Sequence, residues 1–61
     1  MDQLIVDKII QLGHAGKTQY GIATGLKLSQ TVVAYVLNED LRGTKAAKIT
    51  EALNKQEARL A

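Results

Sequence analysis

The first feature that could support chemistry is a long interval of the chain with basic side chains and no acidic ones. The six acidic residues are Asp2, Asp7, Glu39, Asp40, Glu51 and Glu57. Residues 8–38 therefore contain no acid, while they carry Lys8, Lys17 and Lys27, and His14 adds positive charge at lower pH. A surface that binds phosphate groups must not be negative, and this interval meets that condition. The alternative is a chance distribution, because only three lysines are involved.

Residues suited to catalysis or metal binding are scarce. The chain has no cysteine, which excludes a disulfide and a thiolate metal site, and its one histidine gives no zinc ligand set. It has no nucleophile paired with a base, no cluster of carboxylates and no glycine-rich loop of the kind that holds phosphates. We therefore expect a protein that is not an enzyme and that uses no metal, cofactor or small-molecule ligand.

Length and composition limit the size of the fold. The 61 residues suffice for one domain, residues 1–61, whose core rarely supplies more than about 3–5 kcal/mol, so close helix packing or a second copy of the chain must stabilise it. Apolar residues make up 46% of the chain, but no run reaches the ~20 residues of a membrane helix, and residues 1–12 lack a signal-peptide pattern. We expect a cytoplasmic protein. Two tyrosines without phenylalanine or tryptophan argue against a stacking platform for single-stranded nucleic acid.

The elements that must position any site read as helices, the first over residues 3–12. Asp2 is a suitable N-cap. The apolar residues recurring at helical spacing are Leu4, Ile5, Ile9 and Leu12, with Val6 and Ile10 widening the apolar face. Gly13 and Gly16 are expected to end this helix and form a turn. His14 then lies in a solvated loop, the alternatives being a phosphate contact or a pH switch.

Two short helices are predicted next, over residues 19–26 and 30–38, capped by Thr18 and Ser29. Ala23 falls where the two helices would cross. Gly21 and Gly25 each cost up to about 1 kcal/mol inside a helix, so we expect close helix approach at both positions. The apolar members of the later helix are Val32, Val33, Val36 and Leu37. A strand over this valine-rich segment is the competing interpretation, but the chain offers no second strand to pair with it.

The remaining residues predict a loop and a last helix. Residues 39–43 read as a polar loop in which Leu41 turns inward. Thr44 is expected to begin a helix that continues towards Leu60, with an i,i+4 ion pair between Glu51 and Lys55. Its apolar positions are Ala46, Ile49, Ala52 and Leu53.

The segment from Gln19 to Asn38 resembles the helix-turn-helix of phage repressors and the Cro class. The residues in register with that motif are Gln19, Ile22, Ala23, Leu26, Leu28, Ser29, Gln30, Val33 and Val36. Lys27 departs from it, because it occupies the corner where the family usually has glycine, and a left-handed backbone at a lysine costs roughly 1–2 kcal/mol. The resemblance implies an all-α, lambda-repressor-like domain of four to five helices with its motif at about residues 18–38.

The resemblance also implies DNA-contacting residues. The helix over residues 30–38 would lie in the major groove, where the amide of Gln30 bonds adenine and Thr31 bonds a base or phosphate. Ala34, Tyr35 and Asn38 share that face, the alternative for Tyr35 being a half-buried side chain beside the last helix. The expected phosphate contacts are Lys17, Thr18, Gln19, Lys27, Ser29, Arg42 and Lys45, with Lys48 adding to them. For each lysine the alternative is a solvated surface charge.

The implied function is sequence-specific regulation of transcription on double-stranded DNA, in a bacterial cell or a phage-infected host and associated with the nucleoid. One recognition helix reads only a few base pairs, so we expect a homodimer on a two-fold symmetric operator. Leu41, Leu53 and Leu60 are candidates for the dimer surface. A protein-interaction module on the same fold, an anti-repressor or assembly adaptor, is the alternative; an enzyme ranks last, and a fragment of a longer protein remains open.

Overall fold

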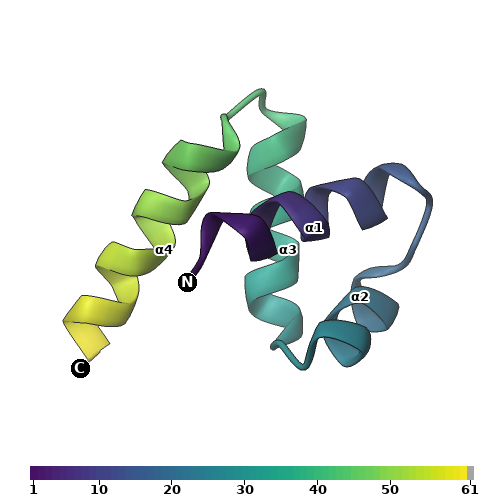
Figure 1. Ribbon diagram of the computed structural model, residues 1–61, viewed down its shortest axis with the longest axis horizontal. Coiled ribbons are helices and arrows are strands. Elements are labelled where there is room, and N and C mark those ends of the chain that lie inside the picture. The colour runs from purple at the N-terminus through teal and green to yellow at the C-terminus, as the bar shows by residue number, and fades with distance from the viewer. Residues whose placement is uncertain (61) are drawn as a thin grey trace.

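The computed structural model describes the backbone of residues 1–60 and the side chains of residues 1–56. These residues form four helices and no strand: α1 (Gln3–His14), α2 (Gln19–Leu26), α3 (Gln30–Leu41) and α4 (Ala46–Leu60) (Figure 1). The predicted all-α class is thereby confirmed. None of the described helices has the length and apolar character needed to cross a membrane.

Helices α1 and α3 each contact all three of the other helices, and α3 lies at the centre of the arrangement. In Figure 1 it stands upright in the middle, with α4 to its left, α2 to its lower right and α1 running across it. Each helix contributes two residues to the buried core, which are Val6, Ile9, Ile22, Ala23, Val33, Val36, Ile49 and Leu53. The core is therefore shared evenly, and α3 is held on three sides.

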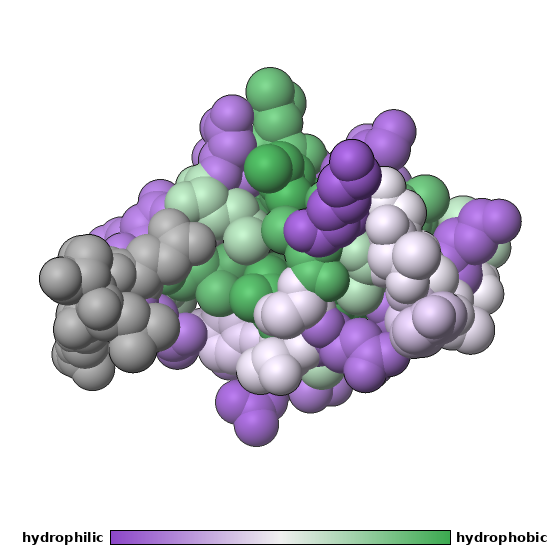
Figure 2. Space-filling view, turned by 90° about the horizontal axis from the view of Figure 1, so that it is seen from below, coloured by the Kyte–Doolittle hydropathy of each residue, from purple (hydrophilic) through white to green (hydrophobic). Residues whose placement is uncertain are grey.

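The inward face of α1 differs from the predicted one. Val6 and Ile9 are fully buried, whereas Leu4 and Ile5 are 75% and 37% exposed. The reason is that Val6, Ile9 and Gly13 recur on one side of the helix at three- and four-residue spacing, and that side meets α3. In Figure 2 hydrophobic side chains accordingly gather at the upper middle of the view and project beyond the hydrophilic ones beside them.

Two of the three predicted N-caps form. The hydroxyl of Thr18 accepts a hydrogen bond from the Gly21 N–H at 3.0 Å, and that of Ser29 accepts from the Val32 N–H at 3.2 Å. Each cap satisfies one of the backbone donors that the first turn of a helix leaves unpaired. Asp2 occupies the N-cap position of α1, but its side chain makes no capping hydrogen bond.

Three helices end in the same C-terminal arrangement, which has a left-handed residue just after the helix. These residues are Gly16 after α1, Lys27 after α2 and Gly43 after α3, with φ of 88°, 58° and 86°. In each case the next residue donates its N–H five positions back, as Leu28 does to the Ala23 carbonyl at 2.8 Å. This is the Schellman motif, which favours glycine because a left-handed backbone strains any residue with a Cβ.

The motif at Gly43 corrects the predicted end of α3. Glu39, Asp40 and Leu41 are helical rather than part of a loop, because the helix continues until this glycine stops it. Leu41 is 83% exposed and does not turn inward. Helix α4 begins at Ala46, two residues later than predicted, and the hydroxyl of Thr44 instead donates to Glu39 at 2.9 Å.

Close helix approach occurs at a glycine other than the two expected. A Cβ on Gly13 would lie 2.5 Å from Leu37 Cδ2, so the missing side chain lets α3 pack against α1 there, and Gly13 lies inside α1 rather than ending it. A Cβ on Gly25 would meet nothing within 4 Å, and one on Gly21 would meet only the Thr18 hydroxyl at 3.2 Å. The prediction for Gly21 and Gly25 is therefore wrong.

The proposed dimer surface is also changed. Leu53 is only 5% exposed and belongs to the core, so it is not available to a second copy of the chain. Leu41 remains accessible, and the side chain of Leu60 lies outside the described residues.

Candidate nucleic-acid interface

The residues predicted to read bases lie along the outer side of α3. Gln30, Thr31 and Asn38 are exposed, while Ala34 and Tyr35 are half-buried. At 100° per residue these five positions lie opposite the side that buries Val33 and Val36. Tyr35 is partly buried against the core. A smaller fraction of its side chain is therefore accessible to a ligand than of the exposed Gln30 and Asn38 side chains.

The N-terminal turn of α3 is presented by a three-residue corner, residues 27–29. Lys27 adopts φ 58° and ψ 45°, which is a left-handed conformation. Leu28 is half-buried against the core and anchors the corner, and Ser29 then caps α3. Gln30 and Thr31 follow immediately. Their backbone is held by the corner before them and by the hydrogen bonds of α3 after them.

The candidate phosphate contacts fall into two separate groups. The first group is exposed and lies just before or at the first turns of α2 and α3; its members are Lys17, Thr18, Gln19, Lys27 and Ser29. Arg42, Lys45 and Lys48 are exposed at the other end of α3, which is about 18 Å long. Lys27 and Ser29 lie just before Gln30 and Thr31 in the chain, whereas Lys17 and Gln19 border a cavity beside the last turns of α3.

The capping hydroxyls of Thr18 and Ser29 can still make a further hydrogen bond. Each hydroxyl oxygen accepts from a backbone N–H, and its own O–H remains able to donate. Both hydroxyls are therefore fixed in position and suited to bond an anion. Arg42 is less free, because its guanidinium lies 3.8 Å from the carboxylate of Glu39.

His14 occupies a place that the sequence did not indicate. It lies in the last turn of α1, not in a solvated loop, and its Nε2 is 2.8 Å from Asp40 Oδ2 on α3. The pair joins residues 26 positions apart, so no local pattern could have predicted it. It borders a cavity of about 180 Å³ whose lining residues are Gly13, His14, Lys17, Gln19, Leu37, Asp40 and Leu41.

Leu41 is a second residue that the sequence reasoning misplaced. It lies three residues after Asn38 and seven after Ala34, so it continues the outer side of α3. That spacing was visible in the sequence and would have identified Leu41 had the helix been extended beyond Asn38. An exposed apolar side chain there can contact a thymine methyl group or a partner protein.

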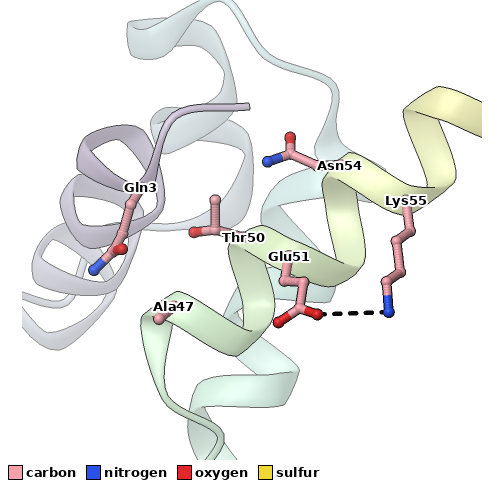
Figure 3. A pocket seen from close by; sticks show the side chains of 6 residues that line it. All are labelled: Gln3, Ala47, Thr50, Glu51, Asn54 and Lys55. Atoms are coloured by element: carbon pink, nitrogen blue, oxygen red, sulfur yellow. Dashed lines mark ion pairs between the residues drawn. The ribbon is translucent and has the colours of Figure 1, made fainter.

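The larger hollows of the surface lie away from α3's outer side. One of about 470 Å³ is formed by α1 and α4 and is lined by Gln3, Ala47, Thr50, Glu51, Asn54 and Lys55 (Figure 3). Glu51 and Lys55 form the predicted ion pair across one turn of α4, at 3.5 Å. None of the predicted base contacts borders this hollow, which is largely open to solvent.

Metal chemistry and similarity to known proteins add no further assignment. Among the residues that the structure describes, no three histidine, aspartate or glutamate side chains are placed to hold a metal ion. No protein-family model, curated protein or solved structure matches the chain. What the exposed side of α3 does must therefore be inferred from its own residues and their geometry.

Proposed function

We propose that the protein is a sequence-specific regulator that binds double-stranded DNA through α2 and α3, acting as a helix-turn-helix of the phage repressor and Cro type. The observation that carries the proposal is the N-terminal turn of α3, where Gln30 and Thr31 are exposed directly after a rigid corner. No acidic residue lies between residues 8 and 38 to repel phosphates from this turn.

In this proposal α3 enters the major groove, which is wide enough for a helix. The Gln30 amide bonds the N6 and N7 atoms of an adenine, while the Thr31 methyl group packs against a thymine methyl. Asn38 supplies a second amide eight residues later, about 12 Å along the helix. Successive base pairs are about 3.4 Å apart, so the two amides span roughly three to four base pairs.

Phosphate contacts set the position of α3 in the groove. The first turn of α2 presents unpaired backbone N–H groups to one DNA strand, and Lys17 and Gln19 lie beside them. Lys27 and Ser29 play the same part at the start of α3. Because each copy reads only a few base pairs, two copies bind half-sites about one helical turn apart.

Selection of bound duplexes from a random DNA pool tests this function. We expect recovery of a short two-fold symmetric site whose half-sites are separated by about 10 base pairs. Recovery of no common sequence, with binding that moderate salt abolishes, would reject sequence-specific recognition and leave only charge attraction.

The second candidate is a protein-docking module that uses the same side of α3. It is favoured by the exposure of Leu41 and of Tyr20, at 83% and 67%, since large exposed apolar residues are typical of protein interfaces. A partner bound in this way would not be displaced by added phosphate or by duplex DNA, which separates the two functions.

A further inference from the structure

The cavity beside His14 combines groups from three helix ends. Gly13 and His14 come from the end of α1, Lys17 from the following turn, Gln19 from the start of α2, and Asp40 from the last turn of α3. Lys17 and Gln19 are two of the proposed phosphate contacts. His14 and Asp40, bonded to each other at 2.8 Å, would lie next to a DNA strand that these two residues contact.

The charges of this cavity nearly cancel when His14 is neutral. Lys17 contributes one positive charge and Asp40 one negative charge, and Gln19 from α2 is uncharged. Glu39, next to Asp40 on α3, is already bonded by Thr44 and lies near Arg42. None of the described side chains of α4, residues 46–56, lines the cavity. Protonation of His14 therefore changes the cavity from neutral to positive.

The cavity also adjoins the outer side of α3. Leu37 and Leu41, which form part of its lining, lie seven and eleven residues after Gln30, which places them along the same edge of the helix. A duplex that contacts Gln30 and Asn38 consequently brings its backbone to this edge. Histidine is the side chain whose proton binding ordinarily falls between pH 5 and 8.

We propose that this cavity binds a backbone phosphate of DNA and that the proton on His14 sets how strongly it does so. The inference rests on the proposed DNA binding and adds its regulation. With His14 neutral, Asp40 opposes the phosphate and offsets Lys17. With His14 protonated, the imidazolium neutralises Asp40 and Lys17 attracts the phosphate without opposition, so DNA affinity rises as pH falls.

Fluorescence anisotropy with a labelled 30-base-pair duplex of mixed sequence tests the proposal, because a phosphate contact does not depend on base sequence. One additional neutralised phosphate adds about 0.9 to the salt exponent of binding, a factor of roughly eight near 0.1 M salt. Between pH 8 and pH 5.5 we expect the wild-type protein to bind roughly four- to eightfold more tightly, with a correspondingly steeper salt dependence.

Three variants isolate the groups. His14→Gln keeps a hydrogen-bonding side chain beside Asp40 but cannot gain a proton, so its affinity should not change with pH, whereas all other titrating groups are retained. Asp40→Asn should bind more tightly than wild type at pH 8. Glu51→Gln, which removes an exposed acid from α4 on the hollow between α1 and α4, is the matched control and should leave affinity unchanged.

A wild-type profile that is flat, or a His14→Gln profile that rises as the wild type does, would overturn the proposal while leaving sequence-specific binding to its own test by selection. Failure of the wild type to bind any duplex at either pH would overturn both. The His14 imidazole proton resonances give a readout that needs no variant: added duplex should raise the midpoint of their pH titration, and an unchanged midpoint contradicts the proposal.

Discussion

Replacing Lys27 with glycine should stabilise the protein, because Lys27 is the only one of the three left-handed helix-ending residues that carries a side chain. Its φ of 58° closes the Schellman motif after α2, a position that Gly16 and Gly43 fill in the other two motifs. The substitution removes the steric strain of a Cβ and leaves the motif's backbone hydrogen bonds in place.

The size of the effect follows from two opposing contributions. A left-handed backbone costs a residue with a Cβ about 1–2 kcal/mol, which glycine does not incur. Glycine also makes the unfolded chain more flexible, which takes back about 0.4–1 kcal/mol. The net gain is about 0.5–1 kcal/mol, or roughly 4–8 °C in melting temperature for a domain of this size.

Thermal unfolding followed by circular dichroism measures this gain, with Lys27→Ala as the matched control. Alanine removes the same charge but retains a Cβ, so its melting temperature should stay near that of the wild type. Both variants should lose DNA affinity equally, and the salt exponent should fall by about 0.9, if Lys27 contacts a phosphate. Equal melting temperatures for the glycine and alanine variants would refute the assignment of strain to this corner.

Two further predictions concern side-chain packing at Ala23 and at two helical glycines, Gly25 in α2 and Gly13 in α1. Ala23→Leu should lower stability by about 1–3 kcal/mol, because Ala23 is buried in the core, whereas Thr24→Leu on the exposed side should change it little. Gly25→Ala should raise stability by about 0.8–1 kcal/mol, since alanine has the higher helix propensity and its Cβ would meet nothing within 4 Å. Gly13→Ala should melt at a lower temperature than Gly25→Ala, because its Cβ would displace the Leu37 side chain. A Gly13→Ala variant as stable as Gly25→Ala would show that Leu37 yields without cost.

Features set by a few neighbouring residues were predictable from the sequence. Thr18 and Ser29 stand directly before apolar helical segments and cap them, and the bounds of α2 agree with those predicted. The same was true of the buried positions Ile22, Ala23, Val33 and Val36, because their spacing places them on facing sides of two adjacent helices.

Features set by contacts between distant residues were not predictable. Gly13 is helical, and Leu37, 24 residues later, occupies the space that a side chain on Gly13 would need, whereas the sequence alone suggested a turn. The hydrogen bond between His14 and Asp40 depends on the last turn of α3. The sequence did not indicate this turn, because Glu39 and Asp40 are polar and read as part of a loop. Both errors concern the junction of α1 and α3, and that junction holds the cavity that we propose as a site for a DNA phosphate.

The most direct test of DNA reading by α3 is the affinity of three proteins for the selected site and for all of its single-base-pair variants. These are the wild type, Gln30→Ala, and Gln56→Ala, whose exposed glutamine lies on α4. Gln30→Ala should lose about 1–3 kcal/mol of discrimination at one position in each half-site and retain it at the others, while Gln56→Ala should match the wild type. An equal loss of affinity for every sequence would contradict base reading by Gln30.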